Sequence, residues 1–120
     1  MSDPPDLDAF FAAVYDRFNA RDVEWLLERM TDDVEWPNVR AGTRLVGRDA
    51  VRAYWLDQWT TIDSNVRPLR ATERPDGRVD VEVQQVLRAT GSGEVVADQV
   101  VHHVYALRDG KVAAMHVEPA

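Results

Sequence analysis

Cysteine is absent from this chain of 120 residues, which excludes disulfide bonds, thiol nucleophiles and cysteine-ligated metals. Long hydrophobic runs are missing too, since no apolar stretch approaches the roughly 20 residues that a membrane-spanning helix needs. The N-terminal residues MSDPPDLDAF lack the positive charge that begins a signal peptide. We therefore expect a cytoplasmic protein that does not bind membranes.

The chain has fewer basic than acidic residues: it contains 14 Lys and Arg and 21 Asp and Glu, which gives a net charge of −7. Such a surface repels phosphate backbones, and no basic stripe opposes this, so we expect no nucleic-acid partner. Dinucleotide, P-loop and serine-hydrolase motifs are lacking as well. These absences predict a protein without a cofactor.

What the chain does have is the composition of an ordinary globular domain, 45% hydrophobic and 29% charged. Its length suffices for a core without disulfide or metal support. We expect residues 1–6 to form a short disordered lead and residues 7–120 to form a single domain.

Helical periodicity dominates the first half of the chain. Apolar residues recur at helical spacing over 7–19, with Asp6 as the N-cap, and again over 23–30 and 47–60. A brief strand at 34–36 and a loop at 38–46 are expected between the last two helices.

After Ser64 the period changes to that of strands, which we expect at about 65–73, 78–90, 94–107 and 111–118. Turn residues separate them, ending with the pair Asp109-Gly110. Helices followed by an antiparallel meander predict an α+β fold, with the N-terminal helices packed on one face of the sheet.

The sequence VVHHVYALRDGKV places His102 and His103 side by side on one strand, so their side chains face opposite ways. Two-residue turns at Ser92-Gly93 and Asp109-Gly110 predict that His102 points inward and His103 outward. The predicted inward set is mainly apolar: Val79, Val81, Val83, Leu87, Val100, Val104, Ala106, Met115 and Val117, with the polar His102, Gln85 and Asp98.

An inward His102 has two interpretations. It is either a core histidine bonded to a carbonyl or to Gln85, or a catalytic acid or base kept neutral by burial. Asp98 lies about 13 Å away along the strand, at the expected mouth of a cavity, and does not orient His102 directly.

The predicted outer face carries His103, His116 and Glu82. These residue types bind metals, but three ligands on an exposed sheet face lack supporting contacts, so we predict no metal site. The same face has Val101 and Tyr105 beside its polar groups. This mixture is typical of a homodimer interface, which we predict through His103, His116, Tyr105 and Val101.

Three segments resemble the nuclear transport factor 2-like superfamily, in particular its SnoaL-like and ketosteroid-isomerase-like members. They are FNARDVEWLLERMTDDVEW (18–36), GRDAVRAYW (47–55) and LRDGKV (107–112). The resemblance covers nearly the whole chain. It implies a strongly curved antiparallel sheet wrapped around helices as a cone, an internal pocket and a homodimer.

The active-site residues of the steroid isomerases in this family, whose pKa values are tuned by their surroundings, have no identical counterparts in this sequence. The oxyanion tyrosine corresponds to Val14, with Tyr15 next to it, and the two supporting tyrosines to Met30 and Trp55. The catalytic base corresponds to Asn38 or, on another anchor, to Trp36, and the protonated aspartate to His102. We therefore expect chemistry other than ketosteroid isomerisation.

The sequence thus predicts a binder of a hydrophobic small molecule. The predicted catalytic residues are His102, Asn38 and Asp98. The predicted ligand-binding residues are Val14, Tyr15, Trp36, Tyr54, Trp55, Trp59, Gln85, Val104 and Met115; the aromatic ones are also explained as plain core. The predicted activity is a cofactor-independent isomerisation, cyclisation or elimination beside a carbonyl. The alternatives are a non-catalytic ligand-binding module and a dimer that binds a protein partner.

Overall fold

The computed structural model describes residues 6–39 and 41–119. The elements follow one another as α1 (Leu7–Asn19), α2 (Val23–Glu28), β1 (Met30–Asn38), β2 (Thr43–Val46), α3 (Arg48–Gln58), β3 (Ile62–Glu73), β4 (Val79–Ala89), β5 (Val95–Arg108) and β6 (Lys111–Pro119). The predicted disordered lead falls outside the described residues, except for Asp6, whose carboxylate caps α1 by accepting a hydrogen bond from the Ala9 amide.

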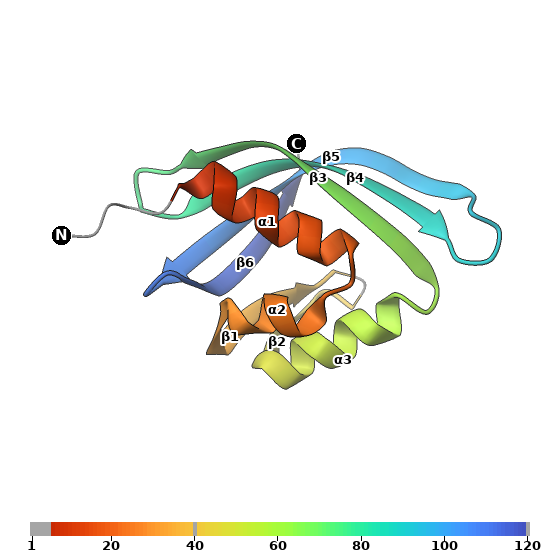
Figure 1. Ribbon diagram of the computed structural model, residues 1–120, viewed down its shortest axis with the longest axis horizontal. Coiled ribbons are helices and arrows are strands. Elements are labelled where there is room, and N and C mark those ends of the chain that lie inside the picture. The colour runs from red at the N-terminus through yellow and green to blue at the C-terminus, as the bar shows by residue number, and fades with distance from the viewer. Residues whose placement is uncertain (1–5, 40, 120) are drawn as a thin grey trace.

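The six strands form one curved sheet in the order β2-β1-β6-β5-β4-β3. Figure 1 shows the arch of β3, β4 and β5 beside α1, while α2 and α3 lie together with β1 and β2 below them. The predicted α+β class and the curved sheet are confirmed. One pairing departs from the antiparallel prediction, because β1 and β6 run parallel.

The segment 38–46, predicted as a loop, contains the edge strand β2, which pairs with β1 from Glu35↔Val46 to Asn38↔Thr43. The two strands form a hairpin, and the Asn38 carboxamide accepts a hydrogen bond from the Ala41 amide in its turn. Pro37 obscured this pattern, because Pro usually ends a strand. It is tolerated here because the pairing of β1 with β6 ends at Glu35, so Pro37 interrupts no hydrogen bond to β6.

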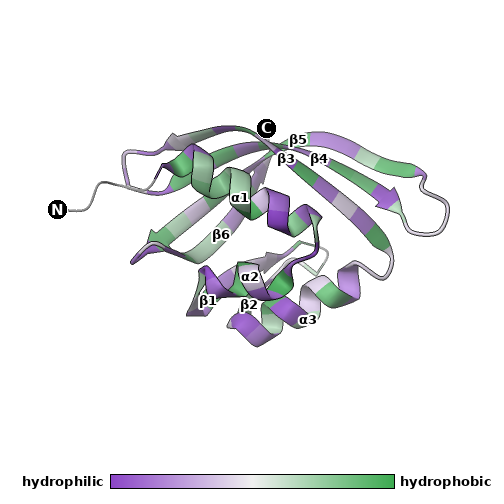
Figure 2. Ribbon diagram, viewed as in Figure 1, coloured by the Kyte–Doolittle hydropathy of each residue, from purple (hydrophilic) through white to green (hydrophobic). Residues whose placement is uncertain are grey.

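Hydrophobic and hydrophilic residues alternate along the long strands (Figure 2). On β4 the alternate positions Val79, Val81 and Val83 are almost completely buried, as the sequence pattern predicts. The core they form with α1 and α3 includes Phe11, Val34, Val51 and Trp55, all at most 2% exposed.

The last hairpin has the turn that Asp109-Gly110 predicts. Both residues have positive φ values, 54° and 78°, and Arg108 pairs with Lys111. The ladder then shifts by one residue, because Leu107 pairs with Val112 whereas Ala106 pairs with Ala114. The extra residue, Ala113, is a β-bulge.

A second shift lies at the other end of β5. Arg88 pairs with Val95, but Leu87 pairs with Ala97, so Val96 is an extra residue there. Because side chains alternate along a strand, these two bulges reverse the predicted faces of β5 relative to its neighbours. The prediction that His102 points inward is therefore wrong, and His103 takes that position.

Candidate active-site pocket

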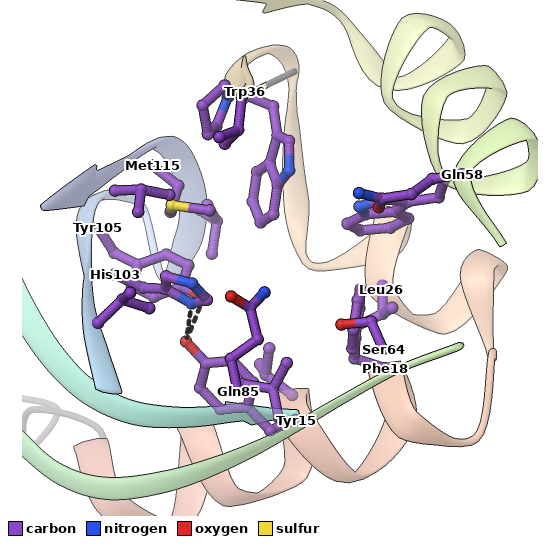
Figure 3. A pocket seen from close by; sticks show the side chains of 18 of the residues that line it. Tyr15, Phe18, Leu26, Trp36, Gln58, Ser64, Gln85, His103, Tyr105 and Met115 are labelled. Carbon is purple, nitrogen blue, oxygen red and sulfur yellow. Dashed lines mark hydrogen bonds between the residues drawn. The ribbon is translucent and has the colours of Figure 1, made fainter. Parts of the chain in front are cut away.

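A cavity of about 230 Å³ lies between the concave side of the sheet and the helices. Aromatic side chains make much of its wall. They are Tyr15, Phe18, Trp36, Tyr54, Trp55 and Tyr105. Figure 3 shows polar groups reaching this cavity from opposite walls, with His103 and Tyr15 on one side and Gln58 and Ser64 on the other.

The aromatic wall is itself tightly packed. The Trp36 and Trp55 rings meet edge to face, with centroids 5.4 Å apart, and Phe18 contacts Trp55 at 5.8 Å. Trp59 stacks against Trp55 from outside the lining, at 5.8 Å and an angle of 19°. The aromatic part of the pocket wall is therefore also part of the hydrophobic core.

One polar part of the wall is a row of three buried groups from α1 and β5. The Tyr15 hydroxyl lies 2.7 Å from the Tyr105 hydroxyl and 2.9 Å from Nδ1 of His103. The other ring nitrogen of His103, Nε2, makes no hydrogen bond to any described residue. The imidazole is thus held from one side and open to the cavity on the other.

Burial sets the protonation of this row. It lowers the pKa of His103 to about 4, with a smaller contribution from the nearby His102, so the imidazole is neutral at neutral pH. Burial also raises the pKa of Tyr15 and of Tyr105, so both hydroxyls keep their protons. The row is uncharged but rich in hydrogen-bonding capacity.

Other polar groups in the lining come from the strands β3, β4 and β5, from Gln58 of α3 and from Arg29 at the end of α2. The Gln85 side chain oxygen accepts a hydrogen bond from Nε2 of Gln99 at 3.2 Å. Ser64, at the start of β3, is 3% exposed and its hydroxyl makes no hydrogen bond to any described residue. Figure 3 shows its oxygen directed toward the cavity, where a ligand group is the available partner.

The predicted ligand-binding residues divide into those that line the cavity and those that do not. The lining includes Val14, Tyr15, Trp36, Tyr54, Trp55, Gln85 and Met115. Val104 is fully buried, but it lies on the His102 side of β5, so placing it in the pocket was wrong for the same reason as His102. Trp59 supports the wall from behind.

None of the three predicted catalytic residues is among the residues that line the cavity. His102 lies on the opposite face, where its Nδ1 bonds the Asp80 carboxylate at 2.6 Å. Asp98 is exposed and accepts a hydrogen bond from Gln84, and Asn38 closes the β1–β2 turn. The bulges at Val96 and Ala113 explain the error for His102 and Asp98.

The same reversal corrects the predicted dimer interface. Val101, His103 and Tyr105 are at most 9% exposed and line the cavity, so they are unavailable to a partner; His116 is exposed on the outer face. Homodimerisation itself stays a prediction. His103 also lies on the other side of the sheet from His116 and Glu82, and the described residues contain no cluster of three or more metal-binding side chains.

One signal for the true orientation was present in the sequence. Asp98 and His102 share a strand face, and a carboxylate fits poorly in an apolar cavity. The two faces of the strand are otherwise alike. One face has Val100, Val104 and Ala106 beside His102, and the other has Val101, Tyr105 and Leu107 beside His103, so hydrophobicity alone did not decide between them.

The SnoaL-like domain model matches residues 11–115. The chain belongs to the SnoaL-like family. No curated protein matches the sequence. In the described residues, no helix is long and apolar enough to cross a membrane.

Several solved structures share the fold of this SnoaL-like protein over most of its length. TerC, co-crystallised with polyporic acid, is 26% identical, with a TM-score of 0.79 over 98% of this chain and 92% of TerC. SalBIII, an epoxide hydrolase/cyclase-like enzyme with a role in pyran ring formation in the polyether salinomycin, is 21% identical, with a TM-score of 0.78 over 92% and 88%. An NTF2-like protein from Burkholderia pseudomallei is 23% identical, with a TM-score of 0.76 over 89% and 85%.

Proposed function

We propose that this SnoaL-like protein binds a hydrophobic, carbonyl-containing cyclic molecule in the cavity and promotes its isomerisation, cyclisation or elimination. The observation that carries this proposal is the open Nε2 of His103 in a wall that is largely aromatic and aliphatic. The open nitrogen of a neutral imidazole can hydrogen-bond a polar atom of the ligand and stabilise charge that develops on that atom during a reaction.

The walls support the choice of ligand class. Trp36 and Trp55 offer flat apolar surfaces, while Gln85 and Ser64 add hydrogen-bonding groups to the same wall. A ligand with a ring body and oxygen substituents satisfies both kinds of surface. The relation to TerC makes polyporic acid a first probe for this chain.

The matched variants His103→Gln and His102→Gln test the proposal. Both make the same substitution on adjacent residues, one in the cavity and one on the outer face. We expect His103→Gln to weaken binding of polyporic acid and of smaller cyclic ketones by about tenfold, the worth of one hydrogen bond of about 1.4 kcal/mol, and His102→Gln to leave it unchanged. Equal binding by both variants, measured by calorimetry, would contradict a ligand contact at His103.

A second candidate is a non-catalytic binding module. The described lining contains no Asp or Glu, so the side chains that most often join histidine as general bases are missing there. Mass spectrometry of a bound ligand recovered after long incubation separates the two functions. A changed ligand supports catalysis, whereas an unchanged ligand that binds tightly supports sequestration.

A further inference from the structure

The row of Tyr105, Tyr15 and His103 has two mutually exclusive arrangements of its protons. The Tyr15 hydroxyl has one hydrogen and two neighbours, at 2.7 Å and 2.9 Å. It therefore donates to one neighbour and accepts from the other. The choice decides which nitrogen of His103 carries the ring proton.

In the first arrangement Tyr15 donates to the Tyr105 oxygen and accepts from Nδ1–H of His103. The Tyr105 hydroxyl then needs another acceptor, and the described residues supply none, although Tyr105 is only 1% exposed. A buried donor without a partner bears the full cost of leaving water. This arrangement therefore leaves an unsatisfied group in the core.

In the second arrangement Tyr105 donates to Tyr15, and Tyr15 donates to Nδ1 of His103. Both hydroxyls of the row now have a partner for their hydrogens, and the donor left over is Nε2–H of His103, which faces the cavity where a ligand can accept from it. Because the imidazole is neutral and Nδ1 acts as an acceptor, its single proton lies on Nε2, the nitrogen that is open to the cavity.

We propose that Tyr105 and Tyr15 hold the proton of His103 on Nε2, making His103 a fixed hydrogen-bond donor that selects ligands with a carbonyl or other acceptor oxygen. This inference rests on the proposed function, in that the pocket has to bind a ligand. It goes further by assigning a direction to the row. Tyr15 is a positioning residue in this scheme, because it acts through His103 and not on the ligand.

Two consequences follow for the chemistry. His103 does not take a proton from the ligand, since its cavity nitrogen is already protonated. Nor does the row release that proton readily, because passing it on would leave a tyrosinate at Tyr105 or Tyr15, and burial raises the pKa of both. His103 therefore stabilises negative charge that builds on a ligand oxygen by hydrogen bonding.

Nitrogen NMR of the ligand-free protein at neutral pH tests the direction of the row. His102→Gln and His103→Gln assign the signals. We expect His103 to show a protonated Nε2 and a hydrogen-bonded, unprotonated Nδ1. A proton on Nδ1, or an equal mixture of the two tautomers, overturns the proposal.

Tyr15→Phe adds a test that a purely structural role does not explain. Without the Tyr15 hydroxyl, the Nδ1 signal is expected to move toward that of a free acceptor, and the tautomer becomes mixed. Tyr54→Phe is the matched control, because it removes a hydroxyl from the same lining without touching the row, and its His103 signals stay unchanged. Unchanged His103 signals in Tyr15→Phe contradict the positioning role.

Ligand preference is tested with three bicyclic probes of similar size: indanone, which has an acceptor oxygen, indole, which has an N–H donor, and indane, which has neither. We expect indanone to bind about tenfold more tightly than indane or indole, which corresponds to one hydrogen bond. In His103→Gln, we expect the difference in affinity between indanone and the other two probes to become smaller. Equal or tighter binding of indole overturns the proposal. If no probe binds while Nε2 is protonated, the proposed function fails and the proton assignment stands.

Discussion

The hydroxyl of Tyr15 lies 2.9 Å from Nδ1 of His103, although 88 residues separate them in the chain. This contact joins the first helix to the central strand β5 inside the core. It is a polar contact among aromatic side chains, with Phe11 and Tyr105 packed at 4.6 Å beside it. The contact therefore links the stability of the domain to the geometry of its cavity.

Replacing Tyr15 with Phe is expected to destabilise the protein by about 1–3 kcal/mol, because it leaves a buried histidine nitrogen without a partner. Urea unfolding monitored by tryptophan fluorescence measures the change. The Tyr54→Phe control, which loses only a long 3.4 Å contact with Gln58, is expected to change stability by no more than about 0.5 kcal/mol. Equal losses in both variants would contradict a specific role for the contact.

Acidification is expected to destabilise the protein through His103. Its pKa falls from 6.5 to about 4 on folding. Between these pH values the imidazole is protonated in the unfolded chain but neutral in the folded protein. The contribution of this group is complete above pH 6.5 and is lost as the pH falls toward 4, in total about 3 kcal/mol.

Unfolding curves of the wild type and of His103→Gln between pH 6.5 and 4.5 measure that loss. Carboxylates contribute below this interval; the hydrogen bond from Arg74, for example, lowers the pKa of Glu118 below its ordinary 4.5. His116→Gln is the control for a histidine that is exposed. If the stability of His103→Gln decreased with falling pH as steeply as that of the wild type, other titrating groups would cause the acid destabilisation.

Deleting Ala113 is expected to leave the inward and outward faces of β6 unchanged. The deletion removes the extra residue between two existing pairs, Leu107↔Val112 and Ala106↔Ala114, so Met115 and Val117 keep their inward positions. Near-ultraviolet circular dichroism detects whether the aromatic core stays packed. Ala113→Ser, which keeps the residue count and the bulge, is the control and is expected to fold. Loss of the aromatic signal in the deletion variant alone would contradict the observed register.

Replacing Asn19 with Ala is expected to cost about 1–3 kcal/mol. The Asn19 carboxamide bonds both the amide and the carbonyl of Val66, each at 2.9 Å, which ties the end of α1 to the edge strand β3. Denaturant unfolding measures the loss. Asn65→Ala, an exposed substitution on the same strand, is the control and is expected to change stability by no more than about 0.5 kcal/mol.

Local interactions explain why much of the fold was predicted. The helix over 7–19, its cap at Asp6 and the Asp109-Gly110 turn depend on residues within a few positions of one another. The inward positions Val79, Val81 and Val83 of β4, and Met115 and Val117 of β6 beyond its bulge, were also identified, because alternation is unbroken over these stretches. The edge strand β2 was missed, since four residues with little burial leave no hydrophobic pattern.

The sequence by itself determined the helices, the last turn, the SnoaL-like family and the aromatic character of the pocket wall, because periodicity and short motifs encode these features. The tertiary structure decided which histidine lines the cavity. Bulges at Val96 and Ala113 appear only in the pairing between strands, and each shifts the register by one residue. Since side chains alternate with a period of two, that shift moves His103 and Tyr105 into the cavity and His102 onto the outer face.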